Sequence, residues 1–354
     1  MRILFVTAHK HLPEMRGGME VNTHDLGHAL IQRGMAVGVL CGLAGRGLVG
    51  LQARARIKLL GDATPKDRVL GYPTWRSWNV VPEVERLVRL FHADVIVLQG
   101  GADFDPLVRA CLATGIPVIF YAHNSHRIAL APELACHPRL HFITNSFYTA
   151  SLHPDKTIRA VIPPLVLRER YATTSDRKLA VFINPAPYKG LAIVNGLAAA
   201  RPDVSFLYVV NSKPPRIHGS LGSGPANVRV VGPVTDMRSI YRHARLLLAP
   251  SQCEETWGRI ATEAHISAIP VLASRQGGLT ESVGPGGLCL DADAPAEEWA
   301  DAFSSLWDDA PRYANVAEAA RVFSLRPEID VVYIVDTFIK TLTAATSTTQ
   351  AARV

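Results

Sequence analysis

Short apolar runs alternate along most of this chain with stretches whose apolar residues recur at helical spacing. In the first half, short apolar runs with the length of buried strands lie at 3–7, 35–41, 94–98, 116–121 and 142–146. Stretches whose apolar residues recur at helical spacing separate them, at 19–33, 82–92 and 106–114. The second half has further runs at 179–183, 204–210, 228–231, 246–249 and 270–273. Strands separated by helices predict parallel sheets, whose functional residues gather at the carboxyl ends of the strands.

The pattern also predicts where the chain divides. A length of 354 residues suits two domains, and 48% hydrophobic residues can supply a core for each. Consecutive prolines at 163 and 164 favour a stiff, extended link. We therefore predict a Rossmann-like domain over 1–165 and a second one over 166–327. Residues 328–354 would form an amphipathic helix with apolar positions from Ile329 to Leu342, followed by a tail that frays from Thr343.

Two carboxylates stand out around the helix predicted to begin near Gly258. Glu255 precedes this helix, and Glu263 lies about five residues inside it, roughly 7.5 Å along the axis. The first turn of a helix offers unpaired N–H groups to an anion. An anion between two carboxylates that can bind hydroxyl groups describes a sugar nucleotide. A solvated acidic loop and an ordinary surface helix residue would explain the same spacing.

The spacing Glu255-x7-Glu263 resembles the signature of retaining glycosyltransferases of family GT4, which have the GT-B fold. The flanking matches are Pro250-Ser251, Pro270-Val271 and Gly277-Gly278-x-x-Glu281. This resemblance implies two Rossmann-like domains that face a central cleft and a C-terminal helix that crosses back to the first domain. It also implies transfer of a sugar from a nucleotide donor with retention at the anomeric carbon, without a metal or another cofactor.

In the first domain the resemblance assigns three residues. Gly17 and Gly18, in Gly-Gly-Met-Glu, match an element that approaches the donor phosphates, and His123 stands where the family has a histidine that contacts the transferred sugar. Taken alone, a glycine pair is more often a turn, and a single histidine at a strand end is more often structural.

In the second domain the resemblance assigns the cation and the two carboxylates. Lys189 would bind the diphosphate, Glu255 the sugar and Glu263 the ribose. Asn184 stands where the family usually has an arginine, so Arg259 is either its substitute or a solvent-facing helix residue. The other expected donor contacts are Pro233, Thr256, Trp257 and Gly258. We expect UDP rather than GDP as the carrier, although no residue of the loop at 232–236 separates the two bases.

The basic excess lies wholly in the first half. Residues 1–165 contain 18 Lys and Arg against 12 Asp and Glu, whereas residues 166–354 contain 19 of each. Arg54, Arg56 and Lys58 alternate with apolar residues and are predicted to share one face of a strand. Such a strand is usually a solvated edge protected by charge. The alternative is a surface for an anionic acceptor or an anionic membrane leaflet. Nucleic acid is disfavoured because stacking aromatic residues do not accompany the basic ones.

Several classes of protein are disfavoured by what the sequence contains. The sequence contains no run of 18 apolar residues, so it predicts no membrane-spanning helix. The five cysteines are scattered and lack CxxC spacing, which favours a reducing compartment. We expect a cytoplasmic protein, with a peripheral place at the inner membrane surface as the alternative. No G-x-G-x-x-G follows the first strand, which disfavours a dehydrogenase. A sugar-nucleotide epimerase and a non-catalytic sugar-nucleotide-binding protein stay open, as do the acceptor and the oligomeric state.

Overall fold

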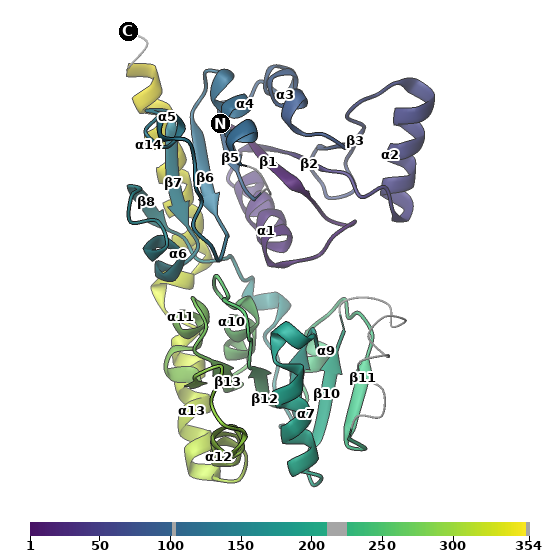
Figure 1. The fold of residues 1–354 in the computed structure, drawn as a ribbon, viewed down its shortest axis with the longest axis vertical. Coiled ribbons are helices and arrows are strands. Elements are labelled where there is room, and N and C mark those ends of the chain that lie inside the picture. The colour runs from purple at the N-terminus through teal and green to yellow at the C-terminus, as the bar shows by residue number, and fades with distance from the viewer. Residues whose placement is uncertain (101–103, 211–224, 352–354) are drawn as a thin grey trace. The chain divides into compact units, whose positions relative to one another are not determined.

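The structure of the protein is a computed structural model that describes residues 1–100, 104–210 and 225–351. The chain divides into two compact units. Unit 1 consists of Met1–Leu165 together with Val331–Val354, and unit 2 consists of Val166–Asp330. Each unit contains one sheet flanked by helices (Figure 1).

Unit 1 is built on an eight-stranded sheet with the order β3-β4-β2-β1-β5-β6-β7-β8. All neighbouring pairs are parallel except β3 and β4. Its strands are β1 (Arg2–Lys10), β2 (Ala36–Gly42), β3 (Lys66–Asp67), β4 (Thr74–Ser77), β5 (Val95–Leu98), β6 (Val118–Ala122), β7 (Leu140–Thr144) and β8 (Ile158–Val161). Its helices are α1 (Gly18–Gln32), α2 (Gly47–Leu60), α3 (Val84–Phe91), α4 (Phe104–Ala113), α5 (Pro132–Ala135), α6 (Phe147–Ser151) and α14 (Val331–Ala351).

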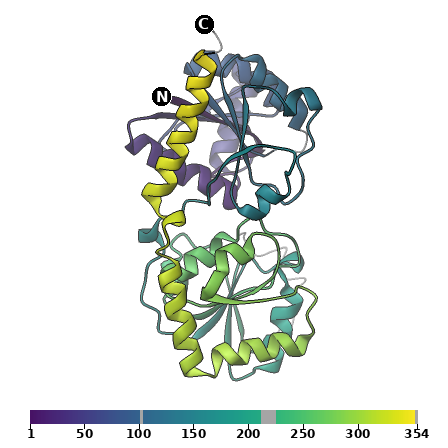
Figure 2. The ribbon, with the colours of Figure 1, turned by 90° about the vertical axis from the view of Figure 1, so that its left-hand side faces the viewer.

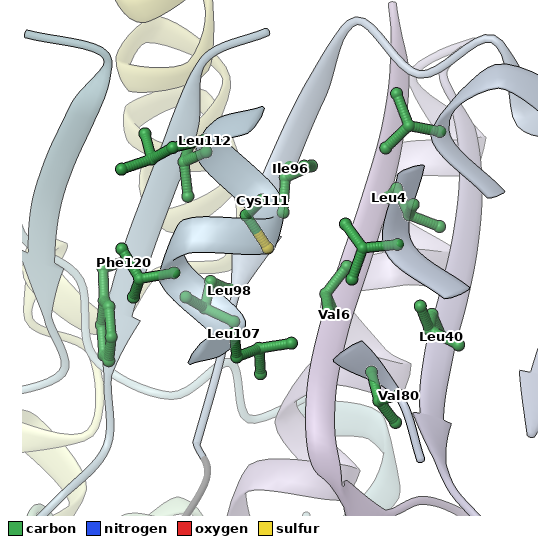
Figure 3. Packing of buried hydrophobic residues seen from close by; sticks show 14 of the residues in the cluster. Leu4, Val6, Leu40, Val80, Ile96, Leu98, Leu107, Cys111, Leu112 and Phe120 are labelled. Carbon is green, nitrogen blue, oxygen red and sulfur yellow. The ribbon is translucent and has the colours of Figure 1, made fainter. Parts of the chain in front are cut away.

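The central strands of unit 1 are apolar on both faces because helices cover both faces. Leu4 and Val6 of β1 belong to one hydrophobic cluster with Leu107 and Cys111 of α4 (Figure 3). The side chain of Phe5 points the other way and stacks on Phe338 of α14, with ring centroids 6.3 Å apart. A continuous apolar run in the sequence therefore corresponds to a strand buried on both sides.

Helix α14 packs on unit 1, as the predicted crossing helix requires (Figure 2). Its buried side chains include Ile334, Phe338 and Leu342, which recur at helical spacing. The predicted fraying from Thr343 is wrong, since the helix continues to Ala351. The Thr343 hydroxyl donates to the carbonyl of Ile339, and Ala345 is buried, so this part of the tail has both hydrogen bonds and packing.

Unit 2 is a fully parallel six-stranded sheet with the order β11-β10-β9-β12-β13-β14. Its strands are β9 (Leu179–Ile183), β10 (Ser205–Val209), β11 (Val228–Val231), β12 (Ala244–Ala249), β13 (Val271–Ser274) and β14 (Gly287–Leu290). Its described helices are α7 (Leu191–Ala200), α9 (Arg238–Tyr241), α10 (Arg259–Ile266), α11 (Leu279–Val283), α12 (Ala296–Trp307) and α13 (Ala310–Phe323). The predicted α/β class with two parallel-sheet domains is confirmed.

The strand predicted around Arg54, Arg56 and Lys58 is wrong, because these residues belong to helix α2. Residues 51–60 consist mainly of Leu, Ala, Arg, Gln and Lys, which are good helix formers. The helix ends at Gly61, whose φ of 65° is typical of a left-handed C-terminal glycine. Within the described ranges, every helix is too short or too polar to cross a bilayer.

Candidate functional site

Lys189 and Glu255 meet at the carboxyl edge of the unit 2 sheet. β9 and β12 are neighbouring parallel strands, so the loops that follow them lie side by side. Lys189, in the loop after β9, forms an ion pair with Oε1 of Glu255, in the loop after β12. The hydroxyl of Ser251 donates to the same carboxylate oxygen at 2.8 Å. Both charged side chains are half-buried, so the pair is only partly screened by water.

A glycine holds the Lys189 loop against the Glu255 loop. Gly190 has a φ of +84°, and a Cβ at this position would lie 2.0 Å from the carbonyl oxygen of Pro250. The backbone N–H of Gln252 donates to the carbonyl of Tyr188 at 2.8 Å. The two loops are thus joined by backbone contacts that place Lys189 beside Glu255.

The glycine pair at 277–278 supports Glu255 from its other side. The N–H of Gly278 donates to the carbonyl of Glu255 at 2.7 Å, and Gly277 pairs with Glu255 in an isolated bridge. Gly277 has a φ of +56°, a value that favours glycine. The backbone of Glu255 is therefore fixed by the residues that the sequence pattern singles out.

Helix α10 begins directly after Gly258, which has a φ of +84°. A Cβ on Gly258 would lie 2.3 Å from Cδ1 of Leu279, so the helix start is pressed against α11. Trp257 is buried, and its indole N–H donates to the hydroxyl of Thr262 at 3.1 Å. Trp257 thus packs under the first turn of α10, while Thr256 before it is half-buried.

Glu263 lies in a buried hydrogen-bonding cluster on α10. Arg259 Nε donates to one carboxylate oxygen at 3.1 Å, and the hydroxyl of Tyr241 donates to the other at 3.0 Å. Arg259 Nη2 also donates to the hydroxyl of Tyr171 at 3.4 Å. Burial raises the pKa of Glu263, and the neighbouring Arg259 opposes that rise. The alternative of an ordinary surface glutamate is therefore excluded, as is a solvent-facing Arg259.

Asn184 follows β9 with a φ of +58°, a conformation in which asparagine is enriched. Its N–H donates to the carbonyl of Val209 at 2.8 Å, which ties the loop to the end of β10. The positive φ at this position therefore explains why an asparagine is favoured here. Pro233 lies exposed in the loop after β11.

In unit 1, Gly17 is the N-cap of α1. The N–H groups of Gly17 and Glu20 donate to the buried Glu20 carboxylate, whose pKa is raised by burial and lowered by these bonds. A Cβ on Gly17 would lie 2.5 Å from this carboxylate, whereas Gly18 has open space around it. The helix start is thus capped by its own glutamate, in the manner of a capping box.

His123 follows β6 and is linked to α1 by hydrogen bonds. The side chain of Gln99, after β5, lies 3.3 Å from His123 Nε2, and the Thr23 hydroxyl donates to Gln99 Oε1 at 2.7 Å. The Tyr121 ring packs on the imidazole with centroids 4.1 Å apart. Burial lowers the pKa of His123 to about 3, so the ring is neutral at pH 7.

Two pairs of predicted residues are in direct contact in unit 2, Lys189 with Glu255 and Arg259 with Glu263. In unit 2, Lys189, Glu255, Arg259 and Glu263 lie in the Lys189 loop, the Glu255 loop and the helix that follows it. In unit 1, Gly17, Gly18 and His123 lie after β1 and β6. Several partners of these residues could not be predicted from the sequence: Thr23, Gln99, Tyr121, Tyr171 and Tyr241. They are brought in by tertiary packing and carry no local motif.

Two surface hollows lie away from these residues. One, of about 280 Å³, is lined by β7, β8 and α14, and the other, of about 360 Å³, lies between α7 and α12. Neither is lined by a predicted site residue. Among the described residues, no group of three or more His, Cys, Asp or Glu is placed to hold a metal ion.

Two family models match the chain. Residues 16–164 match the model described as Glycosyltransferase Family 4, and residues 191–309 match the model described as Glycosyl transferases group 1. The D-inositol 3-phosphate glycosyltransferase of Rhodococcus jostii is 30% identical over 251 residues, which is 68% of this chain and 49% of the relative. That of Corynebacterium kroppenstedtii is 40% identical over 90 residues, or 25% of this chain and 20% of the relative. The chain spans about half or less of the length of these curated relatives.

Solved structures share the fold of the whole chain. Sucrose-phosphate synthase from Thermosynechococcus elongatus is 16% identical with a TM-score of 0.74, over 97% of this chain and 99% of that one. The Anabaena protein HepE, in complex with UDP and glucose, is 19% identical with a TM-score of 0.73, over 97% and 100% of the two chains. A glycosyltransferase from Rickettsia africae is 14% identical with a TM-score of 0.72, over 97% and 98%.

Proposed function

The chain belongs to the group 1, family 4 glycosyltransferases, and on this premise we propose that it transfers a sugar from a nucleoside diphosphate sugar to a hydroxyl group. The observation that carries the proposal is the pairing of Lys189 with Glu255 at the start of the loop that leads to the Glu263 helix. This arrangement offers a cation for a diphosphate and two carboxylates for hydroxyl groups.

We propose that Lys189 binds the donor diphosphate. When the bond to the sugar breaks, negative charge grows on the leaving phosphate oxygen, and a cation already placed beside it stabilises that charge. Glu255 neutralises the ammonium group of Lys189. A bound diphosphate would take over that role, which would leave Glu255 able to accept hydrogen bonds from the sugar.

Glu263 is proposed to bind the ribose hydroxyls. Each carboxylate oxygen has two acceptor positions, and Arg259 and Tyr241 each occupy one. The hydroxyl of Tyr171 also hydrogen bonds to this carboxylate, so a ribose hydroxyl would compete with Tyr171 for an acceptor position. Because Arg259 lies against Glu263, we propose that it orients this carboxylate rather than replacing the missing arginine at Asn184.

The reaction is proposed to retain the anomeric configuration. The bond from the anomeric carbon to the phosphate oxygen breaks, and the bond to the acceptor oxygen forms on the same face. The acceptor proton moves to the departing phosphate oxygen, so no side-chain nucleophile is needed. The contact of the neutral His123 with the transferred sugar and the absence of a metal requirement stay predictions.

We propose that the donor sugar is carried by UDP. The acceptor is not assigned and is tested in the experiment described below. The Anabaena protein with the same fold has been solved with UDP and with UDP-glucose, which supports UDP. The names of the curated relatives point to D-inositol 3-phosphate, an anionic acceptor that would suit the basic excess of residues 1–165.

The test is a panel of UDP- and GDP-sugars, with and without D-inositol 3-phosphate. We expect slow release of the nucleoside diphosphate from a UDP-sugar and faster release with a true acceptor. Interconversion of the donor sugar without release would instead indicate an epimerase. If a sugar nucleotide raises the melting temperature of the protein but is not cleaved in the presence of any acceptor, the protein is a binding protein and not an enzyme.

A further inference from the structure

Helix α2 exposes an apolar stripe along the side that faces away from the protein. Its buried residues, Gly50 and Ala53, lie on the opposite side. Leu48, Leu51 and Leu59 are 81%, 55% and 77% exposed. With Ala55, they follow one another at spacings of three, four and four residues, which keeps them on one side of a helix. Figure 1 shows α2 at the outer edge of unit 1, beyond β3.

Basic residues border this stripe. Residues 46–60 contain four Arg and Lys and no Asp or Glu. By helical spacing, Arg54 and Lys58 lie on one flank of the stripe, and Arg56 lies on the other. Arg56 is paired with Asp62, whereas Arg54 and Lys58 form no ion pair with any residue that the structure describes.

An exposed tryptophan lies beside the same helix. A Cβ on Gly45, just before α2, would lie 2.8 Å from the ring of Trp78 and 2.7 Å from Cδ of Arg54. The Trp78 ring is therefore close to the Arg54 flank, and the residue is exposed. Tryptophan is enriched at membrane interfaces, where its ring sits at the level of the lipid headgroups.

We propose that α2 docks on the surface of an anionic lipid bilayer. The stripe of Leu48, Leu51 and Leu59 would enter the boundary between headgroups and acyl chains, and the flanking basic residues would contact lipid phosphates. A leucine stripe flanked by Arg and Lys is the pattern of helices that lie in this interface. Charge favours the bilayer over a second copy of the chain, because two α2 helices packed together through this stripe would bring six basic residues into one contact.

This surface is independent of the proposed donor site. It lies in unit 1 and contains no residue assigned to the sugar nucleotide. Its test therefore needs no sugar nucleotide, and failure of one proposal leaves the other standing.

The test is co-sedimentation of the full chain with vesicles of phosphatidylcholine alone or mixed with phosphatidylglycerol. We expect binding to the mixed vesicles that weakens as salt is added. The combined variant Leu48→Gln, Leu51→Gln, Leu59→Gln should bind about tenfold or more weakly, because the apolar contact is lost. Arg54→Gln with Lys58→Gln should lose about fivefold per charge at low salt.

A matched control carries Leu90→Gln and Val322→Gln, which remove exposed apolar side chains from α3 and α13. It should bind like the wild type, and circular dichroism should show the same fold for every variant. The proposal is overturned if the wild type ignores mixed vesicles or if the triple leucine variant binds them equally well. It is also overturned if the wild type is a dimer that the triple variant converts to a monomer without any effect of lipid.

Discussion

The ion pair between Lys189 and Glu255 links two proposed roles at the scale of single residues. The cation that would bind the diphosphate forms an ion pair with the carboxylate that would orient the sugar. The pair keeps Lys189 in place and keeps a partly buried ammonium group neutralised. A bound diphosphate could replace Glu255 as the partner of Lys189, because it has both negative charge and several acceptor oxygens.

Replacing Lys189 by alanine should weaken binding of UDP by about 2 to 3 kcal/mol, the range for losing a hydrogen bond to a charged group. This corresponds to roughly a 30- to 150-fold rise in Kd. Isothermal titration calorimetry measures it directly. Lys178→Ala, which removes an exposed lysine of the same unit, is the control and should bind like the wild type. Equal affinities for the two variants would remove Lys189 from the diphosphate site.

The two possible replacements of Glu263 should behave differently. Glu263→Ala would remove the carboxylate that pairs with the buried Arg259, which we expect to cost about 3 to 5 kcal/mol of unfolding free energy. Glu263→Gln keeps a hydrogen-bonding group between Arg259 and Tyr241. It should fold, raise the KM for the donor and leave kcat nearly unchanged, because ribose binding is equal in the ground and transition states. A fall in kcat at unchanged KM would assign Glu263 to the reacting end of the donor.

Part of this site could be predicted from the sequence, for a physical reason. The spacing of Glu255 and Glu263 reflects a loop followed by a helix, and both are local structures. The pairing of Arg259 with Glu263 also had a local signal, since the two residues are four apart on a helix. Tyr241 reaches Glu263 from another helix, and Gln99 reaches His123 from the loop after another strand, so no local pattern could indicate either contact.

At the scale of elements, α2 shows how a short window misleads. Basic residues at 54, 56 and 58 fit the period of a strand, but three positions are too few to exclude a helix. Leu48, Leu51, Ala55 and Leu59 extend over about three turns and show the helical period. Hydrophobic periodicity was harder to read here because α2 is apolar on two opposite sides.

The loop that carries Lys189 should depend strongly on one glycine. Gly190→Ala forces a left-handed backbone on alanine and places its Cβ 2.0 Å from a carbonyl oxygen. We expect a loss of at least about 2 kcal/mol in unfolding free energy, measured by urea denaturation. Gly196→Ala is the matched control in the following helix, where nothing lies within 4 Å. It should gain about 0.5 to 1 kcal/mol. Equal stabilities for the two variants would contradict the tight contact between the loops.

At the scale of the whole molecule, the apolar runs in the sequence predicted the two parallel sheets, but they did not predict several of the strands. β4 has the sequence Thr-Trp-Arg-Ser, and its Arg76 is buried with Asp67 and Glu14 as partners. β14 begins with glycine and is only half-buried. Edge and polar strands of this kind depend on partners far away in the sequence, so their own residues give little signal.

Stability should fall below about pH 6.5 because several histidines are buried. Burial lowers the pKa of His11, His123 and His265 to about 3, whereas an unfolded histidine has a pKa of about 6.5. Between these values the unfolded state binds more protons than the folded state. Each such histidine then lowers the unfolding free energy by up to about 1.4 kcal/mol per pH unit.

Urea denaturation at about pH 7, 6 and 5 measures this effect through the midpoint. Burial raises the pKa of Glu20 and Glu263, which acts in the opposite direction as pH falls, but the pKa values of seven histidines are lowered. A midpoint that stays level from about pH 7 to about pH 5 would show that the buried imidazoles are protonated in the folded protein.

The most direct test of the proposed activity compares nucleotide release by the wild type and by Glu255→Gln. The donor is the sugar nucleotide that the panel identifies, at saturating concentration, and UDP affinity is measured for both proteins. We expect the wild type to release the nucleoside diphosphate. Glu255→Gln should bind UDP at least as tightly, because Lys189 loses its counter-charge, yet turn over at least about tenfold more slowly, a barrier higher by about 1.4 kcal/mol. No release by the wild type from any sugar nucleotide, or equal turnover by the two proteins, would contradict the proposal.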